Sequence, residues 1–247
     1  MRKYNKIKDA CMIVAPTWRS KAYLQVLCER GIVLNTYMLL PGKEPKWDGP
    51  SLVSVHSGGK RIINFSPSES IQATLEKIPS KIVKMKSSDI ESKESLSQID
   101  RLSESVIIYS GVGGRILKQK TLNRGKRFLH VHGGYAPKHR GSTAFYYSLL
   151  EEGTFGVTAL WLDEQLDTGR IIARRKYTKF PSDIDLDRVL DPILRADLLS
   201  SIIQTRLKKG KYPSGVLRKS LRPAYHVIHP ILKHVAMKRY FPNFFRV

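Results

Sequence analysis

The chain has 247 residues, of which 41% are hydrophobic and 26% are charged. This composition excludes a disordered or collagen-like chain and allows a sizeable buried core. Lys and Arg outnumber Asp and Glu by 43 to 21, a net charge of +22 that favours negatively charged partners. Two cysteines are too few for a disulfide framework. No apolar run approaches the roughly 18 residues of a membrane span, so we expect a cytoplasmic protein.

The first forty residues predict a strand, a helix and a second strand. Residues 11–15 and 34–40 are short apolar runs, and residues 20–30 between them carry apolar side chains at helical spacing before Gly31. Such a unit predicts an α/β fold with a parallel sheet. The turn after the first strand, residues 16–20, has no Gly-x-Gly-x-x-Gly pattern, which argues against a NAD or FAD enzyme.

Further elements follow in the same alternating manner. Residues 42–61 are rich in Gly, Pro, Ser and Lys and predict loops around a short segment at 52–55. We then expect a helix at 68–76, a strand at 82–85, a helical face within 87–105, strands at 106–109 and 127–131, a helix at 142–152, and strands at 156–162 and 170–177.

The sequence changes character after residue 180. Asp183, Asp185, Asp187 and Asp191 precede or begin a helical stretch that ends near Lys208. Clustered carboxylates could bind a metal, but Asp at a helix start more commonly caps free amides. Residues 198–247 contain eleven Lys and Arg and no acidic residue, which is half of the net charge.

Two histidines and one aspartate form the clearest pattern of candidate catalytic or metal-binding residues. His130 and His132 are two residues apart near the end of a predicted strand, so their side chains share a face at the carboxyl edge of the sheet. Asp167 lies in a turn before a later strand and could hold one histidine in a single tautomer. The spacing alone leaves three interpretations open: structural strand-end histidines, a zinc site, or acid–base catalysis of a group transfer.

A wider pattern surrounds these residues. It consists of His130-Val-His132, a loop with Pro137 and Arg140-Gly141, then Gly156-Val-Thr158, then Leu166-Asp-Thr-Gly169. Together these segments resemble the signature of the 10-formyltetrahydrofolate-dependent formyltransferases. The resemblance is strongest over residues 106–174, extends less clearly over the rest of residues 1–180, and is absent from the tail.

The resemblance implies a Rossmann-like fold with a mostly parallel sheet. Residues 1–180 would form the catalytic domain, and residues 181–247 a mainly helical or irregular basic C-terminal extension. The implied catalytic residues are His130, His132 and Asp167, with no metal. His130 replaces the asparagine that is usual in the family, where the amide N–H is understood to stabilise the formyl oxygen. An imidazole N–H is also a donor, so we expect His130 to take over that task.

The resemblance also implies a mechanism and a donor. An amine attacks the formyl carbon, both histidines stabilise the developing oxyanion, and His132, oriented by Asp167, helps to move a proton to the leaving nitrogen. The backbone of two loops would hold 10-formyltetrahydrofolate, and the residues implied are Gly114, Arg115, Ile116, Leu117, Asp163 and Leu166. Arg140 would face a phosphate or brace its loop.

Family members formylate different amines. A nucleotide-linked amino sugar, used for a surface polysaccharide or a glycoprotein, is the acceptor we expect here, because its diphosphate suits a basic site. Methionyl-tRNA or another amine is the alternative. A different class of function is a catalytically altered scaffold that binds RNA or a protein. The basic, aromatic tail could pack on the domain, contact a membrane surface peripherally, or bind a protein or RNA.

Overall fold

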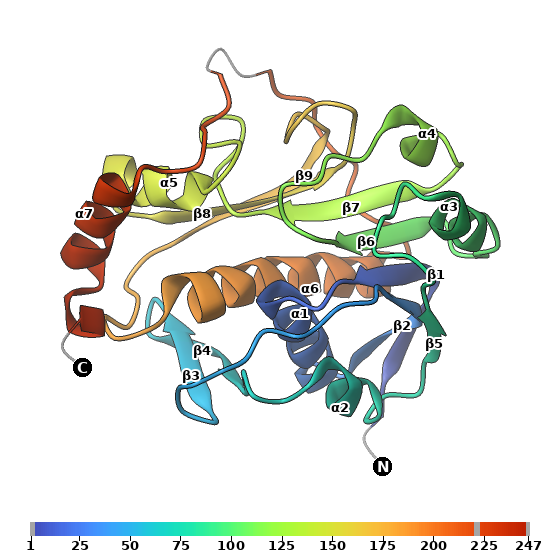
Figure 1. The fold of residues 1–247 in the computed structure, drawn as a ribbon, viewed down its shortest axis with the longest axis horizontal. Helices are drawn as coiled ribbons and strands as arrows, with labels where there is room; N and C mark the ends of the chain where they lie inside the picture. Colours follow the sequence, from blue (N-terminus) through green and yellow to red (C-terminus); the bar gives the residue numbers. More distant parts are fainter. Residues whose placement is uncertain (1–2, 220–222, 246–247) are drawn as a thin grey trace.

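The computed structural model describes residues 3–219 and 223–245. Its centre is a seven-stranded sheet of order β5-β2-β1-β6-β7-β8-β9 (Figure 1). The strands are β1 (Asn5–Val14), β2 (Ile32–Leu39), β5 (Lys81–Lys84), β6 (Val106–Ser110), β7 (Arg127–His132), β8 (Phe155–Trp161) and β9 (Ile171–Tyr177). The pairs from β5 to β7 are parallel, whereas β7–β8 and β8–β9 are antiparallel. The predicted α/β fold with a mostly parallel sheet is confirmed.

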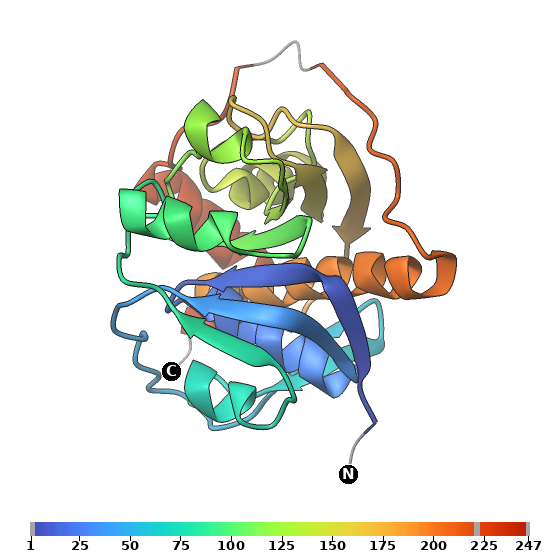
Figure 2. The ribbon, with the colours of Figure 1, turned by 90° about the vertical axis from the view of Figure 1, so that its right-hand side faces the viewer.

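Helices cover both faces of this sheet (Figures 1 and 2). Along β1, Met12 and Val14 belong to one core cluster and Cys11 and Ile13 to another, as the alternation of a strand requires. The first cluster includes α1 (Trp18–Glu29) and α6 (Asp191–Lys209), and the second includes α3 (Lys93–Asp100). The remaining helices are α2 (Ile71–Leu75), α4 (Gln119–Leu122), α5 (Ala144–Glu152) and α7 (Pro230–Tyr240).

Three aspartates near the start of α6 cap or pair: Asp185, Asp187 and Asp191. Asp185 accepts a hydrogen bond from the Arg188 N–H at the start of the π-helical turn Leu186–Leu190, which leads into α6. Asp191 in the first turn of α6 pairs with Arg195 at 2.7 Å. Within the described residues no group of three potential ligands is placed to hold a metal ion. The capping interpretation fits Asp185, whereas Asp191 forms an ion pair instead.

Several predicted segments differ from the structure: the strand predicted at residues 11–15 is β1, which begins at Asn5, and α4 was not predicted. The loops predicted for residues 42–61 contain an antiparallel hairpin of β3 (Val53–Ser57) and β4 (Lys60–Phe65), which turns at Gly58 and Gly59 with positive φ. The strands were missed because they are short and interrupted by polar residues. The helix predicted at 68–76 is only α2, because the Ser70 side chain caps it by accepting from the Ala73 N–H.

The segment after residue 180 shares the core of the preceding strands. Ile193, Leu194 and Ile203 on α6 belong to the same buried cluster as the inner side chains of β1 and α1. Ile228 and Phe241 join that cluster from the last part of the chain. The domain boundary at residue 180 stays a prediction. No helix among the described residues is long and apolar enough to cross a membrane.

Candidate active site

A cavity of about 490 Å³ opens at the carboxyl ends of β6 and β7, the edge where open α/β sheets bind ligands. All nine residues predicted for catalysis and donor binding line it. They are His130, His132, Asp167, Gly114, Arg115, Ile116, Leu117, Asp163 and Leu166. Segments far apart in sequence thus meet at one site.

His132 and Asp167 form a buried pair in this cavity. The Nδ1 atom of His132 lies 3.3 Å from Oδ2 of Asp167, and each side chain is 7% exposed. On the other side of the ring, Nε2 lies 3.1 Å from the backbone carbonyl oxygen of His139. Both neighbours are hydrogen-bond acceptors, so each ring nitrogen of His132 faces an acceptor.

Asp167 is held in an uncommon backbone conformation. Its φ is 54°, in the left-handed region, where a residue other than glycine stores about 1–3 kcal/mol of strain. The Gly141 N–H donates to Oδ2 over 3.0 Å. Burial alone would raise the pKa of the Asp167 carboxyl, but His132, His130 and the Gly141 N–H outweigh it, so the pKa is lowered. Asp167 is therefore a carboxylate at neutral pH.

The motif glycines allow the close approaches around this pair. A Cβ at Gly134 would lie 2.5 Å from His132 Nε2 and 2.3 Å from the His139 carbonyl oxygen, so only glycine fits there. Thr158 on β8 fixes the same loop, since its hydroxyl donates to the Gly134 carbonyl oxygen at 2.7 Å and accepts from the Ala136 N–H at 2.9 Å. The Gly-Val-Thr segment thus supports the loop that carries the His132 contact.

His130 has a different environment. Its Nδ1 lies 3.3 Å from the backbone carbonyl oxygen of Tyr109, which can only accept. Burial, and then the positive charge of Arg19, lower the pKa of His130 to about 3, so the ring is neutral at pH 7. A neutral ring that donates through Nδ1 has an unprotonated Nε2. The N–H donor predicted at this position stays a prediction; in the tautomer that donates to Tyr109, Nε2 is an acceptor.

Two arginines that the sequence patterns did not select also line the cavity. They are Arg19, which follows β1 in the sequence, and Arg195 on α6. Arg195 donates to Asp191 and, at 3.3 Å, to the Val131 carbonyl oxygen. Arg19 donates to the carbonyl oxygen of Gly111 and to Ser110 Oγ. No carboxylate among residues 3–219 and 223–245 forms an ion pair with Arg19. Neither arginine belongs to a local motif; only their contacts across the fold bring them to the site.

The two loops assigned to the donor differ in how they are held. Leu117 is buried in the core, whereas Ile116 is 51% exposed and Leu166 is 38% exposed at the cavity. Arg115 pairs with Asp89 at 2.9 Å. Asp163 accepts from the Thr168 hydroxyl at 2.8 Å, which closes the loop before β9. Arg140 donates to the Leu166 carbonyl oxygen at 3.2 Å, so it braces this loop.

The last part of the chain contacts the loop of residues 140–142, which precedes α5. Tyr225 pairs in parallel with Gly141: its N–H donates to the Arg140 carbonyl oxygen at 2.8 Å, and its own carbonyl accepts from the Ser142 N–H at 2.9 Å. The Tyr225 ring stacks on Tyr147, with 4.1 Å between ring centroids. Gly141, which holds Asp167, is thereby fixed from its other side. Sequence patterns gave no signal for this contact.

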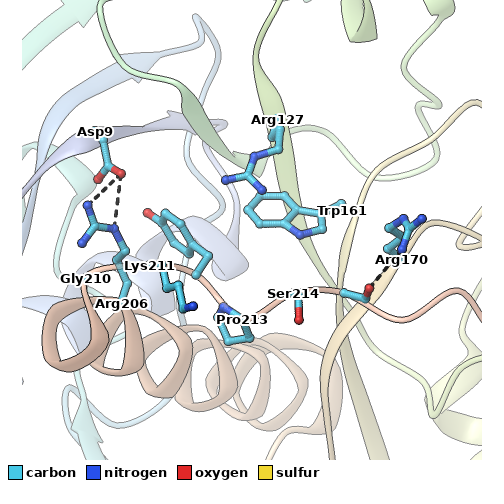
Figure 3. Close-up of a pocket in the computed structure, with 11 residues that line it drawn as sticks. Asp9, Arg127, Trp161, Arg170, Arg206, Gly210, Lys211, Pro213 and Ser214 are labelled. Carbon is cyan, nitrogen blue, oxygen red and sulfur yellow. Dashed lines mark hydrogen bonds and ion pairs between the residues drawn. The ribbon is translucent and has the colours of Figure 1, made fainter.

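A second cavity, of about 610 Å³, is larger but contains none of the predicted catalytic residues (Figure 3). It lies beside Arg127, the first residue of β7, and the guanidinium of Arg127 stacks over Trp161. Arg206 pairs with Asp9 at 3.0 Å, and Lys211 follows the end of α6. Cations near a helix C-terminus stabilise its dipole, which accounts for much of this charge. The first cavity is therefore the candidate active site, because it contains His130, His132 and Asp167, although its volume is smaller.

Comparison with known proteins points consistently to one family. The profile of a family described as "Formyl transferase" matches residues 35–196. The methionyl-tRNA formyltransferase of Finegoldia magna is 32% identical over 119 residues, which are 47% of this chain and 38% of that protein. The methionyl-tRNA formyltransferase of Nitratiruptor is 34% identical over 87 residues, 35% of this chain and 28% of that protein. These matches span well under half of either relative's length.

Solved structures extend the likeness over nearly the whole chain. A sugar N-formyltransferase from Shewanella superposes with a TM-score of 0.56 at 13% identity, over 94% of this chain and 87% of that one. An N-formyltransferase from Helicobacter canadensis, solved with folinic acid and dTDP-3-aminofucose, gives a TM-score of 0.56 at 14% identity, over 95% and 81% of the two chains. At such identities the likeness is one of fold.

Proposed function

The chain belongs to the formyl transferase family, and from this premise we propose that it is a folate-dependent N-formyltransferase. It transfers the formyl group of 10-formyltetrahydrofolate to a primary amine. The observation that carries this proposal is the buried pair of His132 and Asp167, 3.3 Å apart in the wall of an open cavity. A histidine oriented by a carboxylate is the arrangement that proton transfer during acyl transfer requires.

The cavity suits the donor in size and lining. Its volume of about 490 Å³ falls in the range of small-molecule sites. The exposed side chains of Val112, Ile116 and Leu166 offer an apolar surface for a flat ring, beside the polar backbone of both loops. We assign the donor to residues 114–117, Asp163 and Leu166. When bound, the folate supplies an activated formyl group.

We assign the proton transfers of the reaction to two side chains, His130 and His132. The attacking amine would form a bond to the formyl carbon while the bond from that carbon to N10 of the folate breaks. The proton that the amine loses would pass to the unprotonated Nε2 of His130, whose pKa rises when a phosphate of the acceptor compensates the charge of Arg19. His132, oriented through Nδ1 by Asp167, would pass to the leaving nitrogen the Nε2 proton that otherwise faces the His139 carbonyl, and the proton held by His130 would then return to His132. Asp167 fixes the orientation of the His132 ring. This assignment replaces the oxyanion contact expected of His130.

The charge of the cavity supports an acidic acceptor. Arg195 is matched by Asp191 and Arg115 by Asp89, while Arg19 makes no ion pair with the described residues. An acceptor with a phosphate would compensate the charge of Arg19. A nucleotide-linked amino sugar has this chemistry, and the Helicobacter canadensis structure holds such a molecule. We therefore propose an amine of this class, for surface glycan or glycoprotein synthesis.

Methionyl-tRNA is the second candidate acceptor. The curated sequence relatives carry that activity in their names, and the basic chain would attract RNA. Incubation with 10-formyltetrahydrofolate and each amine, followed by mass spectrometry, separates the two candidates. We expect one added formyl group on a nucleotide-linked amino sugar with the wild type and none with Asp167→Asn. No formylation of any amine, together with no calorimetric binding of folinic acid, would leave a scaffold that binds RNA or protein.

A further inference from the structure

Helix α7 is fixed to the protein by one of its faces. Ala236 and Met237 are buried in the main core cluster. Lys233 pairs with Asp187 at 2.6 Å and lies over the ring of Tyr146. Figure 1 shows α7 at the periphery of the molecule, next to α5. Because one face of α7 is fixed to the protein, the opposite face has a fixed position on the surface of the molecule.

That outer face is apolar. Ile231 is 66% exposed, Leu232 44% and Val235 46%, and Val227, just before the helix, is 71% exposed. At about 100° per residue, Ile231, Leu232, Val235, Lys238 and Arg239 fall within an arc of about 120°. We call these five residues the α7 outer face. Branched aliphatic side chains gathered on one exposed face mark an interaction surface, whereas single ones do not.

The charge of the same region selects the partner. Lys238 and Arg239 are exposed, and neither forms an ion pair with any part of the chain that the structure describes. No acidic residue follows Asp197 in the sequence. Two copies of this face would bring like charges together, which disfavours a symmetric dimer. The five residues of the α7 outer face are three apolar side chains and two cations with no carboxylate, a composition that matches the interface of a membrane with anionic lipids.

We propose that the α7 outer face binds the surface of an anionic lipid bilayer. Ile231, Leu232 and Val235 enter the boundary between headgroups and acyl chains, while Lys238 and Arg239 contact lipid phosphates. Val227, next to this face, also lines the active-site cavity. Binding therefore places the cavity near the membrane, where an acceptor held at the bilayer surface would reach it. This inference does not depend on the proposed formyl transfer.

Sedimentation with vesicles of phosphatidylcholine, with and without phosphatidylglycerol, tests the proposal on the full chain. We expect the wild type to bind only the vesicles with phosphatidylglycerol. Ile231→Ser combined with Val235→Ser should weaken binding at least tenfold, an order of magnitude set by the transfer of two aliphatic side chains. Leu52→Ser, at a side chain 58% exposed elsewhere, is the matched control and should bind as the wild type does.

A second pair of variants separates specific docking from the attraction of a net positive charge. Lys238→Gln with Arg239→Gln should weaken binding by roughly fivefold per charge. Lys43→Gln with Lys46→Gln removes two exposed cations outside the face and should have little effect. Equal losses in both pairs, or full binding after the Ile231 and Val235 changes, would overturn the proposal. So would light scattering that shows a dimer dissociated by the Ile231 and Val235 changes, since the face would then be a protein interface.

Discussion

The Nδ1 atom of His132 lies 3.3 Å from Oδ2 of Asp167, and the Gly141 N–H donates to that same oxygen over 3.0 Å. One carboxylate oxygen thus joins three segments: the end of β7, the loop before α5 and the turn before β9. The orientation of this carboxylate fixes the orientation of the His132 ring. A change at Asp167 should therefore lower the rate of the reaction more than it lowers the stability of the fold.

Asp167→Asn keeps the size of the side chain and removes its charge. We expect kcat/KM to fall by about 10²–10⁴, the usual contribution of positioned acid–base groups, because a neutral amide no longer orients His132 as the carboxylate does. Steady-state kinetics with the formylated amine measures the loss. Asp197→Asn is the control, since Asp197 is also buried and pairs with Arg30 and Arg175, but outside the cavity. It should lower stability and leave kcat/KM within a few-fold; equal losses in the two variants would contradict the role of Asp167.

His130→Asn distinguishes a proton acceptor from an N–H donor at this position. Asparagine restores a donor but cannot take up a proton, so we expect kcat/KM to fall by about 10² or more. The fall should equal that of His130→Ala within a few-fold. Activity of His130→Asn within tenfold of the wild type, with His130→Ala far below, would show that His130 donates to the formyl oxygen as its family counterpart does.

The low pKa of His130 predicts a loss of stability in acid. The unfolded chain binds a proton near pH 6.5, whereas the folded protein binds it only near pH 3. Stability is therefore complete above about pH 6.5 and falls as the pH drops toward 3, because the unfolded state gains protons first. Urea unfolding at pH 7.5 and at pH 5 should show a smaller loss for His130→Asn than for the wild type. Equal losses would mean that the histidine is not held neutral by the fold.

Arg19→Met tests the second cause of that low pKa. Removal of the positive charge should raise the pKa of His130, while burial keeps it below the ordinary value. Titration of the ring by NMR measures the change directly. Arg170→Met removes an exposed arginine from outside the cavity and should leave the titration unmoved. An unchanged pKa in Arg19→Met would show that burial alone keeps the ring of His130 neutral.

Much of this site could be predicted because its residues lie in local patterns. The strand that ends in His130 and His132, and the turn with Asp167, are short segments whose spacing survives in a single sequence. The tautomer of His130 could not be predicted, since it depends on the carbonyl of Tyr109 on a neighbouring strand. Arg195 and Tyr225 were missed for a similar reason: both lie beyond residue 180, in segments without a motif, and only long-range packing brings them to the site.

Gly141→Ala tests whether the C-terminal segment supports the catalytic pair. Gly141 has a φ of 100°, and a Cβ there would lie 2.3 Å from the Tyr225 carbonyl oxygen and 2.8 Å from its nitrogen. Either the segment around Tyr225 or the loop must move, and movement of the loop withdraws the N–H from Asp167. We expect kcat to fall by about 10-fold to 100-fold, because loss of the hydrogen bond from the Gly141 N–H displaces Asp167 and with it His132.

Gly125→Ala is the matched control for this change. Gly125 also has a positive φ, of 68°, but a Cβ there would meet no atom within 4 Å. Its substitution costs about 1 kcal/mol of stability through backbone strain alone and should leave kcat unchanged. Thermal unfolding and kcat measured on both variants separate strain from displacement. If Gly141→Ala lost only as much stability as Gly125→Ala and kept its kcat, the contact between Tyr225 and Gly141 would have no part in holding Asp167 against His132.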